Sequence, residues 1–150
     1  MMSAIYRLLW TLSGNRCCDI MCCKADETHN RHTSVECTDQ SRIVDVLEWK
    51  PHPKFAGVAM RHLVVGKDTG GRMSVHQVRI DPGCTISDHV HADMVEIHDV
   101  VTGAGTCRIA GKEIQYLPGV IGIMPADTVH RIDAGDNGLL LLATFSPPLE

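Results

Sequence analysis

Two histidines one residue apart begin the part of this chain whose residue types best suit chemistry. His89 and His91 lie in the stretch 83–103, GCTISDHVHADMVEIHDVVTG, and Glu96 follows them. Side chains at positions i and i+2 of a strand leave the same face, so both imidazoles can coordinate one metal ion together. Glu96 can join them if the short segment HADM turns the chain back past the pair. These residues predict a metal site.

A candidate for the fourth donor comes from later in the chain. His130 lies in TVHRI (128–132), directly after the turn formed by residues 125–127. Strands that are distant in sequence become neighbours in a barrel, so His130 can face the first three donors. Three imidazoles and one carboxylate suit a divalent first-row transition metal (Fe, Mn, Ni, Co, Cu or Zn) and leave room for water or substrate.

The elements that must position these donors are short strands. Their β-branched runs are separated by Gly, Pro, Asp or Asn, and no long amphipathic helix interrupts them, which predicts an all-β sandwich or barrel. An earlier segment, SRIVDVLEW (41–49), fits either a short strand or one helical turn. The predicted strands are residues 58–65, 72–80, 94–101, 106–110, 113–117, 120–124, 128–132 and 139–145.

The stretch 83–103 resembles the first motif of the cupins. Five residues separate Gly83 from His89, four separate His91 from Glu96, and six separate Glu96 from Gly103, and all of these spacings match the motif. The first motif is highly specific. The resemblance implies a double-stranded β-helix, or jelly-roll barrel, over about residues 56–147.

Residues 119–134 resemble the second cupin motif, which on its own is a weaker signal. Gly119 and Pro125 keep its spacing, and His130 follows the proline by five residues. By this resemblance His130 is the fourth metal ligand, beside His89, His91 and Glu96. Three positions depart from the usual glycine, asparagine and acidic residue: Asp127, Ala134 and Val120. The departures bear on the turn and on supporting hydrogen bonds, because none of them replaces a ligand.

The surroundings of three other histidines and one arginine depend on strand register. His98 shares a strand face with Glu96, and three roles are open to it: a proton acceptor beside the metal, a general acid or base, or a hydrogen-bonded core residue. His76 lines the pocket only if Ser74, Val78 and Ile80 also point inward. The same ambiguity of register applies to His62 and to Arg108, of which the arginine is expected to be exposed.

Two classes of function follow from a metal site in such a barrel. The first is a metal-dependent enzyme that acts on a small organic molecule, of dioxygenase, isomerase or lyase type, with Glu96 or His98 as a base. The alternative is a non-catalytic module that binds a sugar or an organic acid. The fold hosts many reactions and does not choose between them.

Composition narrows the remaining possibilities. A chain of 150 residues with a net charge of −4 and no basic run suits one domain without a nucleic-acid or membrane partner. The expected partners are a small-molecule substrate or ligand and a second copy of the chain, because the run 139–145 has leucines on both faces. We expect a barrel over 41–150, preceded by an irregular or partly helical arm over 1–40.

The first forty residues carry weak signals. The apolar part of residues 1–20 is too short for a membrane span and lacks the order of a signal peptide. Seven cysteines is an odd number, so a reduced cytoplasmic protein is expected, and the role of Cys17, Cys18, Cys22 and Cys23 stays open. A short helix over 4–12 and a start at Met21 are two further possibilities.

Overall fold

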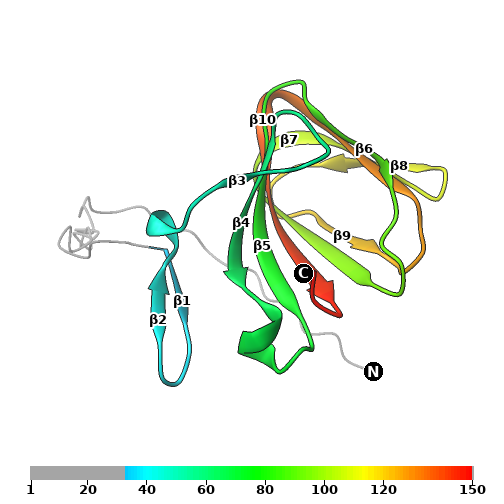
Figure 1. Ribbon diagram of the computed structural model, residues 1–150. Coiled ribbons are helices and arrows are strands. Elements are labelled where there is room, and N and C mark those ends of the chain that lie inside the picture. The colour runs from blue at the N-terminus through cyan, green and yellow to red at the C-terminus, as the bar shows by residue number, and fades with distance from the viewer. Residues whose placement is uncertain (1–32, 150) are drawn as a thin grey trace, which may run out of the picture. The chain divides into compact units, whose positions relative to one another are not determined.

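The computed structural model describes residues 33–149, all of which belong to one compact unit. The helix expected over 4–12, the four clustered cysteines and the alternative start at Met21 lie outside the described residues. The architecture is all-β, as predicted (Figure 1). Its strands are β1 (Ser34–Glu36), β2 (Ser41–Ile43), β3 (Lys50–Pro51), β4 (Val58–Val64), β5 (Ser74–Ile80), β6 (Thr85–His89), β7 (Val95–Ile109), β8 (Lys112–Tyr116), β9 (Ile121–Met124) and β10 (His130–Ser146).

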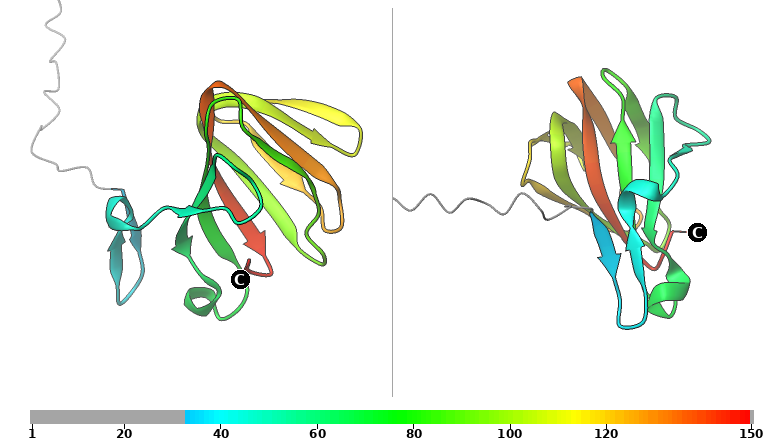
Figure 2. Two further views of the ribbon diagram at one scale, coloured as in Figure 1. Left: turned by 45° about the horizontal axis from the view of Figure 1, so that its top comes forward. Right: turned by 90° about the vertical axis from the view of Figure 1, so that its left-hand side faces the viewer.

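Two long strands organise the barrel. β7 has 15 residues and β10 has 17, and they pair with each other in antiparallel fashion over most of their length. β10 also pairs with β5 and β6, and β7 pairs with β8 and β9, so that the strands curl around a common interior (Figures 1 and 2). The turn residues within β7 and β10 suggested two strands each, but the pairing continues through both.

A glycine allows the two long strands to bend against each other. Gly103 has a φ of +85°, and a Cβ on it would lie 2.2 Å from the carbonyl oxygen of Gly138 in β10. Any larger residue would therefore combine a strained backbone with a clash against backbone atoms. The positive φ of Gly103 and its close approach to β10 therefore explain why a glycine closes the first cupin-like motif.

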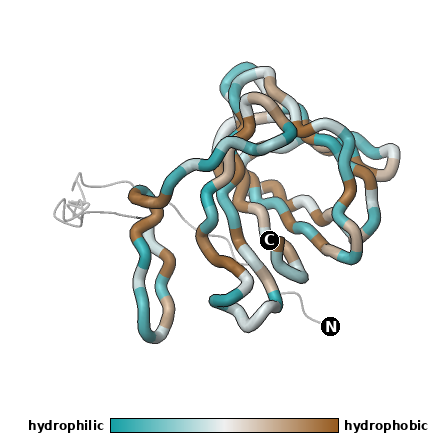
Figure 3. Tube along the Cα trace, viewed as in Figure 1, coloured by the Kyte–Doolittle hydropathy of each residue, from teal (hydrophilic) through white to brown (hydrophobic). Residues whose placement is uncertain are grey.

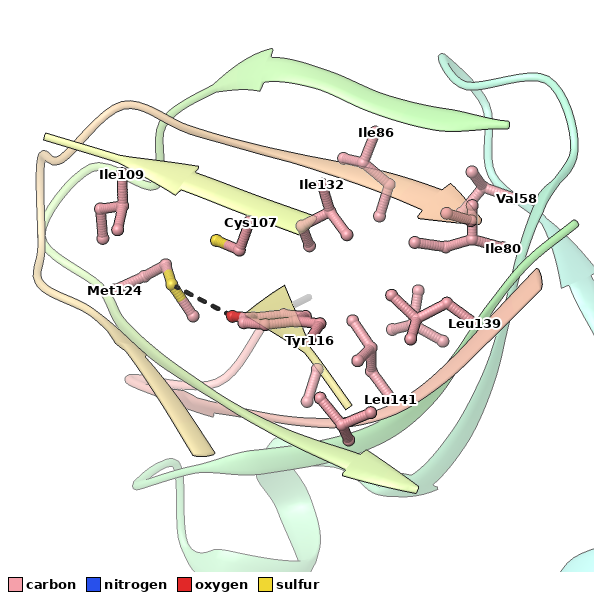
Figure 4. Close-up of a cluster of buried hydrophobic side chains, with 14 of the residues drawn as sticks. Val58, Ile80, Ile86, Cys107, Ile109, Tyr116, Met124, Ile132, Leu139 and Leu141 are labelled. Carbon is pink, nitrogen blue, oxygen red and sulfur yellow. Dashed lines mark hydrogen bonds between the residues drawn. The ribbon is translucent and has the colours of Figure 1, made fainter. Parts of the chain in front are cut away.

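The core fills the barrel interior. Hydrophobic and hydrophilic residues alternate along the barrel strands (Figure 3), as the period of a half-buried strand requires. In β5 the inward residues are Ser74, His76, Val78 and Ile80, all of them buried. Tyr116, Ile132 and Leu141 are among the fully buried side chains at the centre (Figure 4).

Residues 33–49 precede the barrel strands. β1 and β2 form a hairpin, and the 3-10 helix η1 (Val44–Val46) follows it directly, so 41–49 contains both a strand and a helical turn. The expected boundary at residue 40 falls inside this hairpin. Arg42 binds both carboxylate oxygens of Asp68 in the second 3-10 helix, η2 (Gly66–Thr69), at 2.7 and 2.8 Å. Among the described residues, no helix is long and apolar enough to cross a membrane.

Candidate metal centre

Three strand ends bring the four predicted donors together. His89 is the last residue of β6, and His130 is the first of β10 and pairs with it. Glu96 is the second residue of β7, and His91 lies in the connection between β6 and β7. One ligand atom from each residue lies within 4.8 Å of the others, which is the spacing expected of donors around a single ion.

Two aspartates shape the turns below the cluster. Asp93 has a φ of +56° and Asp127 a φ of +61°, in the left-handed region that Asp tolerates better than most residues. The backbone N–H of Asp127 donates to the carbonyl of His91 at 3.1 Å, and its carboxylate accepts from the backbone N–H of Asp93 at 3.4 Å. Asp127 therefore keeps the conformation of the usual motif glycine and also links the two turns.

Backbone carbonyls fix the ring orientation of two ligands. Nδ1 of His89 lies 2.9 Å from the carbonyl oxygen of Ser87, and Nδ1 of His130 lies 3.0 Å from that of Thr128. A carbonyl only accepts, so each Nδ1 carries the hydrogen and donates it. This leaves Nε2 as the coordinating nitrogen, which is the usual arrangement of a metal-bound histidine.

The cluster holds its carboxylate as an anion. Burial alone would raise the pKa of Glu96, but the charge of His98 and hydrogen bonds from His130, His91 and His98 outweigh burial and lower this pKa well below its usual value. Nε2 of His130 lies 3.1 Å and Nε2 of His91 lies 3.3 Å from the same oxygen, Oε2. An anionic oxygen that faces several imidazoles is the environment in which a cation is stabilised.

The protonation of His89 also fits a metal ligand. Burial lowers the pKa of His89 to about 4, and repulsion from His130 adds to this effect. The imidazole is therefore neutral near pH 7, as coordination requires. His130 differs, because its bonds to Glu96 and Thr128 outweigh burial and raise its pKa. A cation at the centre would take the place of the proton that His130 shares with Glu96.

His98 braces the other oxygen of Glu96. Its Nε2 lies 2.7 Å from Oε1 of Glu96, and its Nδ1 lies 3.0 Å from the hydroxyl of Tyr116. Burial raises the pKa of Tyr116, so its hydroxyl stays protonated, and this hydroxyl also donates to Sδ of Met124 at 4.0 Å (Figure 4). Because a carboxylate only accepts, Nε2–H of His98 donates to Glu96. Both ring nitrogens thus have protein partners, and His98 is 1% exposed. His98 therefore contacts Glu96, one of the candidate metal ligands, and does not line the cavity.

A cavity of about 540 Å³ opens beside two of the donors, His89 and His91. Other lining residues come from β4, where His62 was a candidate, and from the segment that leads into β4, to which the sequence gave no role. Prolines at 51 and 53 were the only local signal, and they indicated a strand end rather than a binding wall. The lining residues of this segment are Lys50, Pro51, His52, Pro53, Lys54 and Phe55.

The remaining candidates are placed by strand register. His76 is buried and points inward, and burial, helped by repulsion from His62, lowers its pKa to about 4. His62 lines the same cavity as His89 and His91. Arg108 is exposed and pairs with Glu113 at 3.0 Å, as expected for a strand arginine outside the pocket.

Comparisons with known proteins identify the fold. No family model and no curated protein matches the chain. Among solved structures, KdgF from Halomonas sp. is 23% identical with a TM-score of 0.61, over 69% of this chain and 88% of that one. A predicted oxalate decarboxylase from Thermotoga maritima is 20% identical with a TM-score of 0.64, over 69% and 96%. An RmlC-like cupin from Shewanella frigidimarina is 18% identical with a TM-score of 0.63, over 76% and 93%.

The barrel has the cupin fold. The expectation drawn from the two motifs is therefore confirmed for the architecture. The cupin barrel explains why residues 41 positions apart, His89 and His130, become paired neighbours, since β6 and β10 lie side by side in it. Identities this low show the fold alone, so the chemistry must be argued from the residues of this chain.

Proposed function

We propose that the cupin barrel binds one divalent transition metal through His89, His91, Glu96 and His130 and acts as an enzyme on a small organic molecule. The observation that carries this proposal is the convergence of four donor atoms within 4.8 Å at the edge of a cavity of about 540 Å³.

Some residues of the site would bind the metal, and others would position the metal ligands. A bound metal would supply Lewis-acid or redox chemistry to an oxygen-bearing substrate. His89 and His130 present Nε2 because backbone carbonyls hold their Nδ1–H groups. His98 holds Oε1 of Glu96, so in this proposal it is a positioning residue. A role for Glu96 or His98 as a base stays a prediction.

The test combines metal content with turnover. Protein purified without added metal is analysed by mass spectrometry, then loaded separately with Fe, Mn, Ni, Co, Cu or Zn. Each form is incubated with small carboxylic acids and sugar phosphates, and their conversion is followed by NMR. We expect conversion with at least one metal and none with His130→Ala. Stoichiometric metal without conversion of any compound would favour the non-catalytic binding module, and absence of metal binding would overturn the proposal.

Two expectations about context stay predictions. A homodimer would cover apolar side chains such as Ile97 in β7 and Ile123 in β9, which are paired neighbours and are both exposed. Light scattering coupled to size-exclusion chromatography would decide the oligomeric state. The cytoplasmic location is likewise untested.

A further inference from the structure

A second group of polar side chains lies beside the cavity. It is separate from the metal cluster, that is, from the four candidate metal ligands His89, His91, Glu96 and His130. Nδ1 of His62 is 2.9 Å from Nδ1 of His76, and Nε2 of His76 is 2.8 Å from the hydroxyl of Ser74. The backbone N–H of Leu149 donates to this hydroxyl at 2.9 Å. His76 and Ser74 are 0% exposed, so water does not complete their hydrogen bonds. Together they form a chain from a backbone amide to His62.

The backbone amide sets the direction of this chain. Because Leu149 donates to Ser74, the buried hydroxyl hydrogen needs another acceptor, and Nε2 of His76 is the one within reach. His76 then carries its hydrogen on Nδ1 and donates to Nδ1 of His62. The opposite direction would leave a buried hydroxyl hydrogen unpaired, which costs about 1–3 kcal/mol.

His62 consequently carries its N–H group on Nε2, an atom without a hydrogen-bond partner among residues 33–149. Burial lowers the pKa of His62, and repulsion from the Lys50 ammonium adds to this effect, so the ring is neutral near pH 7. His62 lines the same cavity as His89 and His91.

The wall around His62 is cationic. Lys50 and Lys54 line the cavity, and among its lining residues from the described part of the chain none is Asp or Glu. The charge of Lys54 also contributes, after burial, to a lowered pKa of His52. The whole chain has a net charge of −4, so the positive charge of this wall is a property of the cavity and not of the chain as a whole. A wall that offers cationic hydrogen-bond donors and no carboxylate favours a ligand with an anionic oxygen.

We propose that the cavity binds a small organic anion whose carboxylate is held by Lys50, Lys54 and the Nε2–H of His62, while its other end reaches the metal position. This inference rests on the proposed function and specifies the substrate class for the same site. It assigns His62 to ligand recognition and Ser74 and His76 to positioning His62.

Two probes that differ only at the far end separate the cationic wall from the metal. 2-Oxoglutarate and 2-oxopentanoate have the same chelating 2-oxo acid head, and only the former has a second carboxylate. Titration calorimetry on the zinc-loaded protein should show that 2-oxoglutarate binds at least about tenfold more tightly. Lys50→Gln should remove most of this difference and leave the affinity for 2-oxopentanoate unchanged.

Lys67 offers a matched control. It lines a neighbouring cavity of about 680 Å³ that shares His62 but not Lys50. Lys67→Gln should leave both affinities unchanged. Equal affinities for the two probes, or loss of 2-oxoglutarate binding in Lys67→Gln alone, would overturn the inference. Zinc content, measured separately, keeps the two proposals apart: selective 2-oxoglutarate binding without zinc would refute the metal site and retain the anion site.

The tautomer of His62 is tested by NMR of the ¹⁵N-labelled, zinc-loaded protein. We expect the Nε2–H form of His62 in the wild type and in Leu149→Ala, which keeps the backbone amide. Leu149→Pro removes that amide and should shift His62 toward the Nδ1–H form. An unchanged tautomer in Leu149→Pro, or an Nδ1–H form in the wild type, would refute the positioning chain.

Discussion

Residues 33–149 contain two groups of histidines with different geometry. In the metal cluster, ring nitrogens of His91, His98 and His130 converge on the carboxylate of Glu96 at 2.7–3.3 Å. In the second group, the nitrogens of His62 and His76 form a line that ends at Ser74. Convergence on an anion creates a cation site, whereas a line of neutral groups fixes the direction of hydrogen bonds.

The two groups also differ in their support. The donors of the metal cluster lie at strand ends and in a turn, where the chain can bring four side chains to one point. His62, Ser74 and His76 lie within the paired strands β4 and β5, with His62 directly opposite His76. Strand pairing places His62 and His76 side by side, whereas strand ends and a turn let the four donors converge on one point.

The largest expected effect comes from a substitution in the metal cluster. Glu96→Gln keeps the shape of the side chain and removes its negative charge. We expect zinc affinity to fall by at least about a hundredfold, as measured by competition with a chelator. His62→Gln is the matched change in the linear group and should alter zinc affinity by less than about threefold. Equal losses in the two variants would contradict the division into two groups.

Removal of one buried hydroxyl from each group gives the next effect. Tyr116→Phe removes the hydroxyl that pairs with Nδ1 of His98, and Ser74→Ala removes the acceptor of the Leu149 N–H. Each should lower the free energy of unfolding in urea by about 1–3 kcal/mol. Only Tyr116→Phe should also weaken zinc binding, by about tenfold, because His98 holds Glu96. A similar loss of zinc in Ser74→Ala would show that the groups are coupled.

The linear group should contribute a pH dependence of stability. The pKa of His76 is lowered to about 4 in the folded protein, so between about pH 6.5 and pH 4 the unfolded chain binds a proton that the folded chain does not. Stability therefore falls as the pH falls through this range, on the order of 3 kcal/mol from His76. Urea unfolding with a chelator present, compared between wild type and His76→Gln, measures this contribution. Parallel pH profiles for both proteins would refute it.

The sequence predicted the first group better than the second. His89, His91, Glu96 and His130 follow from motif spacing, and strand alternation predicted that His98 points into the barrel beside Glu96. Spacing carries this information because three of the donors lie at strand ends and His91 lies in the short turn between two of those strands. The barrel itself was predictable from recurring turns, although two pairs of predicted strands are single long strands, β7 and β10.

The second group could not be found from local pattern. His62 and His76 are 14 residues apart on different strands, and their contact depends on the register of β4 against β5. A shift of one residue would place His76 on the outside. β6 was missed because TISDH alternates poorly, and its burial depends on pairing with β10. Lys50 and Lys54 gave no signal because lysines beside prolines are typical of surface loops.

The smallest expected effect concerns the turn below the metal cluster. Asp127 adopts a φ of +61°, and its carboxylate accepts from the backbone N–H of Asp93 at 3.4 Å. Asp127→Gly removes the backbone strain and also this long hydrogen bond, so the free energy of unfolding should change by less than about 0.5 kcal/mol. Asp127→Ala keeps the strain without the bond and should destabilise by about 1 kcal/mol.

Urea unfolding and zinc titration of both variants measure these changes. Zinc affinity should stay within about threefold of wild type in Asp127→Gly, because a glycine preserves the turn that places His91 and His130. A loss of more than about 2 kcal/mol in Asp127→Gly would show instead that the carboxylate, rather than the backbone conformation, holds the two turns together. The departure from the usual glycine would then be part of what makes the donors of this chain converge.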